Sequence, residues 1–367
     1  MRAAIFRKGE IVVDDLPEPT PGSGQVLTKT LACGICGSDL HARVHAERMN
    51  KALESVPWRK GMDLTRDVVF GHEYCCEILD HGPGCDKRMK VGTRVVSVPR
   101  LMVNGGLEGI GYSNTNVGGY AERMVLGESF LLEVPNGLSS SHAALTEPLA
   151  VGIHAVEKAQ IDGGEVPLVI GCGPVGLAVI AALRRKRKTV NLGPIIAADF
   201  SPKRRELAQR MGADVVVDPA AGSPYRTWAE HAALTPAEIA AAPPTVMTAA
   251  AGLKPALIFE CVGVPGIIQK IFEGAAQNAR IVIVGVCMET DRQEPLLAIF
   301  KELNIQYVLG YTGDEFATSL RLLAEGDVDG SALISGAVGL DGVAGGFKAL
   351  ANPEQHIKIM IEPAGTS

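Results

Sequence analysis

The stretch VPLVIGCGPVGLAVIAALRR, residues 166–185, decides the fold of this 367-residue chain. A short apolar run leads into a Gly-rich turn, and a longer apolar run follows. Gly171, Gly173 and Gly176 have the spacing G-x-G-x-x-G. The first glycine allows a tight turn, the second lets the backbone approach a pyrophosphate, and the third lets a helix pack against the strand. The stretch therefore predicts a strand, a dinucleotide-binding turn and a helix.

The uncharged run at residues 166–183 also has the length of a membrane-span candidate. Its middle is interrupted by glycines and a proline, so a buried strand, a tight turn and a buried helix explain it better. The N-terminal MRAAIFRKGE lacks the apolar core of a signal peptide. We therefore expect a soluble, cytoplasmic protein with no membrane partner.

The segments after this stretch alternate between strand and helix patterns. The predicted strands are IIAADF, VVVD, LIFECVG and RIVIVGV, and PKRRELAQRMG is a predicted helix that ends at Gly212. This alternation predicts a parallel sheet with right-handed crossovers. Before it, residues 1–132 alternate short apolar runs with Gly, Pro and Asp, which predicts a β-rich domain.

Three further motifs supply one thiol, one imidazole and two carboxylates: GICGSDLH at residues 34–41, GHE at 71–73 and TEP at 146–148. That set suits a catalytic Zn²⁺ with one coordination position left open. Cys33 and Cys36 alone would also fit a zinc knuckle or a redox pair, but no second C-x-x-C follows downstream. We expect the eight cysteines to be free thiols or metal ligands rather than disulfides.

In this order, GICGSD, GHE, TEP and GCGPVG resemble the motifs of the zinc-dependent medium-chain dehydrogenase/reductase family, which includes alcohol, sorbitol and threonine dehydrogenases. The resemblance covers most of the chain. It implies an α/β fold with two domains. One is a Rossmann domain with a doubly wound parallel sheet at residues 151–306. The other is a β-rich, GroES-like catalytic domain at residues 1–150, to which the tail at residues 307–367 returns.

The family pattern makes Cys36 the thiolate ligand and His72 the imidazole ligand of the zinc. The third ligand is left open. Glu147 stands where alcohol dehydrogenases have a cysteine, whereas Glu73 is a carboxylate that sorbitol- and threonine-type enzymes can use. Glu73 could instead only hydrogen-bond to a ligand. A set with a single thiolate favours a chelating polyol or hydroxy-amino substrate.

The same resemblance implies a path for the proton. Asp39 would orient the imidazole of His72. Ser38 would take the proton of the alcohol, and the cofactor ribose and His41 would pass it to solvent.

Two long stretches depart from the lengths usual in the family. Residues 42–70 are charged and lie between two proposed ligands, so we expect them to wall the substrate cleft. Residues 219–255 are rich in Ala and Pro, which indicates a mobile or low-complexity insertion with a helix around YRTWAEHAAL.

The choice of cofactor is predicted from Asp199, which ends the strand IIAADF. A carboxylate there accepts hydrogen bonds from a ribose 2′-OH and repels a 2′-phosphate, so we expect NAD over NADP. The alternative of NADP stays open, because a 2′-phosphate could pair with one of the nearby basic residues Lys203, Arg204 and Arg205. The predicted cofactor-binding residues are Gly171, Gly173, Pro174, Val175, Gly176 and Asp199, to which the resemblance adds Cys261, Val262, Gly263, Val284, Val286 and, at the pyrophosphate, Lys358.

Many family members also hold a structural zinc in a four-cysteine lobe, but residues 100–124 contain no cysteine, so we expect one catalytic Zn²⁺ and no structural zinc. The net charge of -6 argues against a nucleic-acid partner. The predicted function is hydride transfer between NAD and a secondary alcohol, polyol or hydroxy-amino compound, by a homodimer or homotetramer. The alternatives are a zinc-free quinone or enoyl reductase and a catalytically silent NAD-binding sensor.

Overall fold

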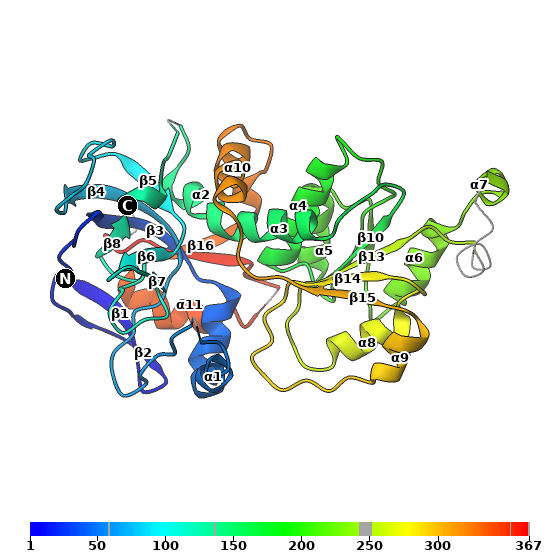
Figure 1. Ribbon diagram of the computed structural model, residues 1–367, viewed down its shortest axis with the longest axis horizontal. Helices are drawn as coiled ribbons and strands as arrows, with labels where there is room; N and C mark the ends of the chain where they lie inside the picture. The colour runs from blue at the N-terminus through cyan, green and yellow to red at the C-terminus, as the bar shows by residue number, and fades with distance from the viewer. Residues whose placement is uncertain (58, 136, 242–251, 353, 366–367) are drawn as a thin grey trace. The chain divides into compact units, whose positions relative to one another are not determined.

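The computed structural model of the chain describes residues 1–57, 59–135, 137–241, 252–352 and 354–365. Contacts between residues divide the chain into two units, which are described separately (Figure 1). Unit 1 comprises Met1–Pro148 and Thr312–Ser367, and unit 2 comprises Leu149–Tyr311. Within the described ranges, no helix combines the length and the apolar character that crossing a bilayer requires.

Unit 1 is built mainly of antiparallel strands. Its strands are β1 (Arg2–Arg7), β2 (Glu10–Asp15), β3 (Gln25–Gly34), β4 (Glu73–His81), β5 (Arg94–Ser97), β6 (Arg100–Val103), β7 (Gly106–Gly109), β8 (Arg123–Gly127), β9 (Leu131–Glu133), β16 (Ile334–Val338) and β17 (Lys358–Ile361). Its helices are α1 (Gly37–Leu53), α2 (Ser140–Ala144), α10 (Gly313–Ala324) and α11 (Val343–Ala349). The helix α3 (Thr146–Lys158) begins in unit 1 and continues in unit 2.

The main sheet of unit 1 joins the two sequence segments of the unit. Its strand order is β16-β17-β3-β4-β5-β9, with β8 also paired to β3. Gly34 at the end of β3 is the register partner of Glu73 on β4 and of Met360 on β17. The C-terminal strand β17 therefore lies beside the end of β3, close to the GHE motif.

Unit 2 contains a six-stranded sheet in which every neighbouring pair is parallel, with the order β12-β11-β10-β13-β14-β15. Its strands are β10 (Val166–Ile170), β11 (Ile196–Ala198), β12 (Val215–Val217), β13 (Ala256–Glu260), β14 (Arg280–Ile283) and β15 (Asn304–Tyr307). Its helices are α4 (Pro174–Lys186), α5 (Pro202–Met211), α6 (Pro224–Ala232), α7 (Pro236–Ala241), α8 (Ile267–Gly274) and α9 (Pro295–Phe300).

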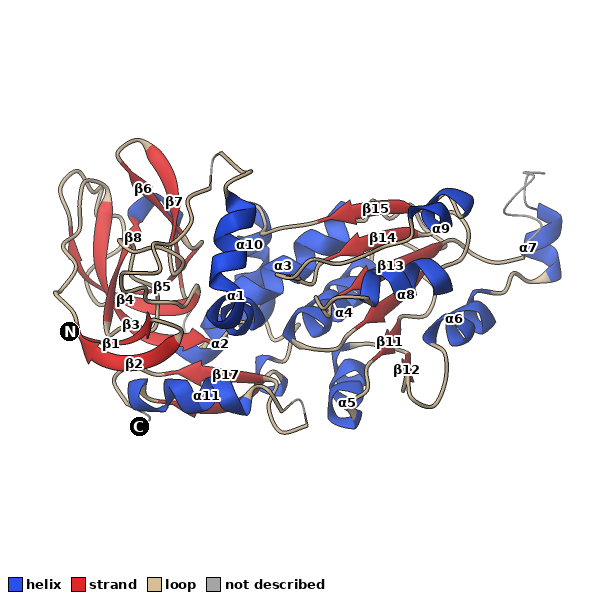
Figure 2. Ribbon diagram, turned by 90° about the horizontal axis from the view of Figure 1, so that it is seen from below, coloured by secondary structure: helices blue, strands red, loops and turns tan. Residues whose placement is uncertain are grey.

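Helices cover both faces of this parallel sheet. In Figure 1, α4 and α5 lie on one side of the sheet, and α8 and α9 lie on the other, while Figure 2 shows the strands β13, β14 and β15 side by side. The predicted α/β class with a doubly wound parallel sheet is confirmed.

The Gly-rich turn after β10 depends on close backbone packing. Gly171 has φ +91°, and a Cβ on Gly176 would lie 1.8 Å from the carbonyl oxygen of Gly171. Gly173 precedes α4, and a Cβ there would meet only the guanidinium of Arg204, at 3.8 Å. The third glycine is thus required for packing of the turn itself, whereas the second leaves space above the backbone.

The Ala- and Pro-rich stretch contains the predicted helix, which is α6. Trp228 on α6 is buried, and its indole nitrogen donates a 2.9 Å hydrogen bond to the carbonyl oxygen of Val166 at the start of β10. This contact anchors the first part of the stretch on the sheet. Residues 242–251, where the sequence also predicts a mobile or low-complexity insertion, lie outside the described residues.

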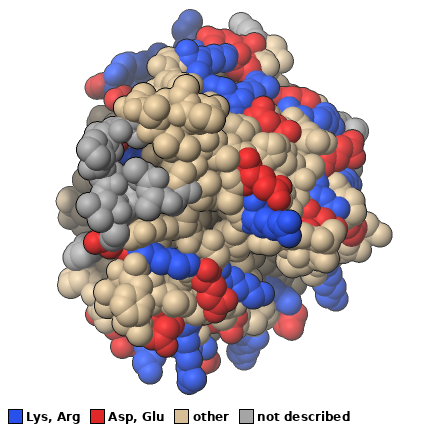
Figure 3. Space-filling view, turned by 90° about the vertical axis from the view of Figure 1, so that its right-hand side faces the viewer, with Lys and Arg blue, Asp and Glu red and all other residues tan. Residues whose placement is uncertain are grey.

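The first residues of the stretch 42–70 form the second part of α1, which has a kink at His45. The side-chain oxygen of Asn50 on α1 accepts a 2.9 Å hydrogen bond from the backbone nitrogen of Met62, so the connection after the helix is fastened back onto it. On the face drawn in Figure 3, Lys and Arg side chains are interspersed with Asp and Glu.

Gly176→Ala is expected to lower the free energy of unfolding by about 1–3 kcal/mol, because its methyl group would overpack the turn. Gly173→Ala is the matched control. Its methyl group meets no atom nearer than 3.8 Å, and its stability should stay within about 0.5 kcal/mol of the wild type. Urea unfolding measures both values. Equal stability of the two variants would contradict the close contact between Gly176 and Gly171.

Candidate metal centre

The N-terminus of α1 positions the first group of site residues. Cys36 directly precedes the helix, and its backbone nitrogen donates a 3.1 Å hydrogen bond to Oδ2 of Asp39. An acidic side chain in the first helical turn that reaches back to the residue before the helix is half of a capping box. The hydroxyl of Ser38 lies 3.1 Å from Sγ of Cys36 and donates to it. Local helix capping therefore places the thiol, the hydroxyl and the carboxylate together.

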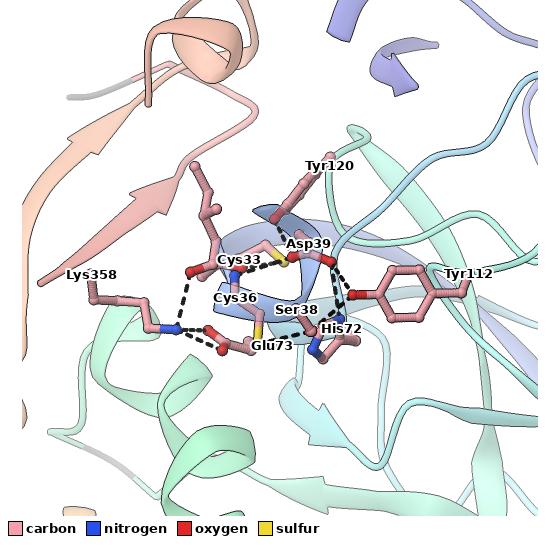
Figure 4. A network of polar contacts seen from close by, with 11 residues as sticks. Cys33, Cys36, Ser38, Asp39, His72, Glu73, Tyr112, Tyr120 and Lys358 are labelled. Carbon is pink, nitrogen blue, oxygen red and sulfur yellow. Dashed lines mark hydrogen bonds and ion pairs between the residues drawn. The ribbon is translucent and has the colours of Figure 1, made fainter. Parts of the chain in front are cut away.

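The GHE motif brings the imidazole and a carboxylate to the same thiol. Ligand atoms of Cys36, His72 and Glu73 all lie within 4.8 Å of one another (Figure 4). Glu73 is completely buried and His72 nearly so. A thiol, an imidazole and a carboxylate at this separation are a donor set of the kind that binds zinc. The residues present therefore fit the predicted metal ion.

A buried ion pair holds the carboxylate of Glu73. Nζ of Lys358 lies 2.6 Å from each carboxylate oxygen and donates a further hydrogen bond of 3.1 Å to the carbonyl oxygen of Ile35. Both side chains of the pair are 1% exposed. Burial alone would lower the pKa of Lys358, but Glu73, with Cys36 and Glu147, raises that pKa above its ordinary value. The ammonium group therefore stays charged at neutral pH.

Space for this carboxylate is made by a glycine. A Cβ on Gly34, the register partner of Glu73, would lie 2.0 Å from Oε2 of Glu73. The first glycine of GICGSDLH is thus needed for the site, and any larger residue would displace the carboxylate.

Asp39 accepts hydrogen bonds from two tyrosines that sequence analysis missed. The hydroxyl of Tyr112 lies 2.7 Å from Oδ1 and that of Tyr120 lies 2.6 Å from Oδ2. Burial and the charge of Asp39 raise the pKa of both phenols well above the ordinary value, so both remain protonated donors. No sequence motif marks these tyrosines, which lie in residues 100–124, where many family members have a four-cysteine lobe and this chain has no cysteine.

His72 lies among negative groups. Its Nδ1 is 3.5 Å from Oδ1 of Asp39, which is an ion-pair distance rather than a good hydrogen bond. Burial by itself would lower the pKa of His72, but Asp39, Cys36 and Glu147 raise it well above its ordinary value. In the absence of a metal ion, a proton on the imidazole partly compensates the surrounding negative charge.

Glu147 and His41 complete the predicted residues of unit 1. Glu147 lies in the first turn of α3, is buried, and is close enough for its charge to raise the pKa of both His72 and Lys358. His41 lies on α1 and is partly exposed, with its ring stacked near that of His45.

In unit 2, the predicted cofactor residues cluster at the carboxyl ends of the strands. Asp199 follows β11, and its Oδ2 accepts a 2.7 Å hydrogen bond from the backbone nitrogen of Cys172 in the Gly-rich turn. A guanidinium nitrogen of Arg204 lies 3.9 Å from the same oxygen. Asp199 thus also holds the turn in place, a contact that the sequence did not predict.

The turn after β13 is also stabilised by a carboxylate. Oε1 of Glu260 accepts hydrogen bonds from the backbone nitrogens of Val262 and Gly263, at 2.7 and 2.9 Å. Val262 and Val286 expose apolar side chains beside this turn, whereas Val284, directly after β14, is buried. Glu260 is another residue that sequence analysis missed, because only its position at the end of β13 gives it this role.

The environment of Lys358 differs from the one that the sequence predicts. The sequence predicts it beside the pyrophosphate, but its ammonium group is enclosed in unit 1 with Glu73 and Ile35 as hydrogen-bond partners. The physical reason is the register of β17 on β3, which directs this side chain towards the GHE motif. A contact between Lys358 and the cofactor stays a prediction.

Comparisons with known proteins identify the family of the chain. Residues 22–136 match the family model described as alcohol dehydrogenase GroES-like domain, and residues 174–325 match the zinc-binding dehydrogenase model. A (R,R)-butanediol dehydrogenase of Bacillus subtilis is 30% identical, with 99% of this chain and 100% of that protein covered. A sorbitol dehydrogenase of the same organism is 28% identical over 99% of this chain and 97% of its own length.

Solved structures show the same relationship. The crystal structure of 2R,3R-butanediol dehydrogenase from Bacillus subtilis superposes with a TM-score of 0.74 at 27% identity, and 99% of each chain is covered. The chain therefore belongs to the zinc-dependent medium-chain dehydrogenase family. Its predicted identity as a zinc-dependent oxidoreductase is confirmed at this level.

Removing one partner of the buried pair should strongly destabilise the metal-free protein. Glu73→Gln and Lys358→Met are each expected to cost about 3–5 kcal/mol, because each leaves an uncompensated buried charge. The double variant should lose much less than the sum of the two. Lys186→Met is the control, since the more exposed pair of Lys186 with Glu157 contributes at most about 1 kcal/mol. Additive losses at Glu73 and Lys358 in urea unfolding would refute the pairing.

Proposed function

We propose that the chain is an NAD-linked dehydrogenase of secondary alcohols, with vicinal diols and sugar alcohols as its preferred substrates. The observation that carries this proposal is the group formed by Cys36, His72 and Glu73, with the hydroxyl of Ser38 3.1 Å from the thiol. A zinc ion, when bound, acts as a Lewis acid that makes a coordinated hydroxyl more acidic. Ser38 is then the group of this chain that receives the proton, and His41 is the group that passes it to solvent.

We further propose one zinc per chain, with Glu73 as the third protein ligand. Its carboxylate lies with the thiol and the imidazole within 4.8 Å. Lys358 would orient this carboxylate and reduce the negative charge of the set. Glu147 would then act through its charge, and it remains the alternative ligand.

The substrate class is supported by the ligand chemistry and by the names of the relatives. A carboxylate ligand and a single thiolate give a harder site than two thiolates would, and such a site accepts a second substrate oxygen more readily. The similar proteins are butanediol and sorbitol dehydrogenases.

The wild type is therefore expected to oxidise 2,3-butanediol or sorbitol with a kcat/KM at least tenfold above that for ethanol, because a chelating diol gains a second metal contact. Cys36→Ala should lose both zinc and turnover but retain NAD binding. Cys33→Ala is the matched control from the same motif, and it should keep both. Metal analysis and NADH formation measure these outcomes. Primary monoalcohols as the best substrates, or a zinc-loaded and active Cys36→Ala, would refute the proposal.

We also propose a preference for NAD, based on Asp199 at the end of β11. Asp199→Asn should reduce discrimination between NAD and NADP by roughly tenfold or more, because it removes a charge that repels a 2′-phosphate while keeping an oxygen for the backbone of Cys172. Arg204→Ala is the control and should instead weaken any residual use of NADP. The ratio of kcat/KM for the two cofactors measures this effect. An unchanged ratio in Asp199→Asn would place Asp199 away from the ribose.

For assembly, we propose a homodimer or homotetramer. The strand β15 forms one end of the parallel sheet, and Tyr307 and Leu309 are exposed beside it. The helix α9 exposes Ile299 and Phe300 in the same region of the sequence. An open strand edge with exposed apolar side chains is a ready surface for self-association.

A further inference from the structure

Tyr112 contacts two residues of the proposed proton path at once. Its hydroxyl oxygen lies 2.9 Å from Oγ of Ser38 and 2.7 Å from Oδ1 of Asp39 (Figure 4). It comes from the loop at residues 110–116, which is closed by a 3.3 Å hydrogen bond from the backbone nitrogen of Gly111 to the carbonyl oxygen of Asn116. The ring is fixed by edge contact with Phe70. The phenol is therefore held in place by both its ring and its hydroxyl.

The proton of this phenol has two acceptors. The hydroxyl of Tyr112 donates to Oδ1 of Asp39 at 2.7 Å and to Oγ of Ser38 at 2.9 Å. The hydrogen bond to the charged Asp39 is the stronger of the two, because an ionised acceptor roughly doubles the strength of such a bond. Asp39 therefore fixes the phenol oxygen beside Ser38.

Ser38 is consequently held from two sides. Its Oγ accepts the 2.9 Å hydrogen bond from Tyr112, and its own proton is donated to the sulfur of Cys36 at 3.1 Å. Sulfur forms only weak hydrogen bonds, so the contact with Tyr112 is the stronger restraint on the hydroxyl. Tyr112 therefore fixes the Ser38 oxygen beside the thiol.

We propose that Tyr112, held by Asp39, is a positioning residue that fixes the Ser38 hydroxyl beside Cys36 for acceptance of the alcohol proton. This inference rests on the proposed dehydrogenase function. Tyr112 does not touch the substrate and acts only through Ser38.

Tyr120 provides a matched control within the same site. Its hydroxyl donates to the other oxygen of Asp39, at 2.6 Å, and its ring is fully buried. Tyr120→Phe and Tyr112→Phe therefore each remove one donor from Asp39 and keep the aromatic ring, but only Tyr112→Phe removes the neighbour of Ser38. A difference between the two variants isolates the contact with Ser38.

The first experiment measures steady-state oxidation of 2,3-butanediol by zinc-loaded wild type, Tyr112→Phe, Tyr120→Phe, Ser38→Ala and the double variant Ser38→Ala/Tyr112→Phe. Tyr112→Phe should lower kcat about tenfold, as expected for the loss of one orienting hydrogen bond, with KM and zinc content within about twofold of the wild type. The double variant should be no slower than Ser38→Ala. Multiplicative losses in the double variant, or equal losses in Tyr112→Phe and Tyr120→Phe, would overturn the proposal.

The second experiment uses the metal-free protein and needs no activity, so it separates this inference from the proposed function. Ser38→Ala should lower the urea midpoint of the wild type and of Tyr120→Phe by the same amount, but should change that of Tyr112→Phe less. Equal shifts in all three backgrounds would show that Ser38 and Tyr112 are not coupled. Absence of dehydrogenase activity in the wild type, with this coupling intact, would refute the function but not the contact.

Discussion

The fully buried ion pair between Glu73 and Lys358 is the contact on which the metal centre depends. Its members are 285 residues apart in the chain, and they bring the C-terminal strand β17 to the end of β3. A buried pair gains little net stability, because removing two charges from water costs about as much as their attraction returns. A one-residue shift of β17 on β3 would turn Lys358 to the other face of the sheet and leave Glu73 without its partner.

The other residues of the site place negative groups around the imidazole of His72. Cys36 and Asp39 are delivered together by the capping of α1, while His72 and Glu73 are delivered by the start of β4. Asp39 is stabilised by donors from Tyr112, Tyr120 and the backbone of Cys36. Such a cluster is unfavourable without a cation, and the negative charges of Asp39, Cys36 and Glu147 raise the pKa of His72 despite its burial. A divalent ion would supply the positive charge, which is the physical basis for zinc binding.

The sequence was sufficient for features set by local spacing. The turn Gly171 to Gly176 and the alternation of strands and helices define the parallel sheet because each depends on residues close in the chain. The motif order also identified Cys36, His72 and Glu73, which the structure brings together. In contrast, Tyr112 and Tyr120 lie 73 and 81 residues from Asp39, and no local pattern marks them.

Long-range register explains the other differences from expectation. The environment of Lys358 is determined by which residues of β17 pair with β3, and this pairing cannot be read from the letters HIKIMIEP alone. Asp199 was predicted for the ribose, but its hydrogen bond to the turn depends on the packing of β11 beside β10. Sequence motifs thus identify donors and acceptors, whereas sheet pairing decides which partners they meet.

The central claim is that one thiolate, one imidazole and carboxylate oxygen hold a single zinc ion in unit 1. Zinc X-ray absorption spectroscopy of the zinc-loaded protein tests it most directly. The expected spectrum has one sulfur at about 2.3 Å and nitrogen or oxygen neighbours at about 2.0–2.2 Å. Two or more sulfur neighbours, or none, would contradict the proposed set of ligands.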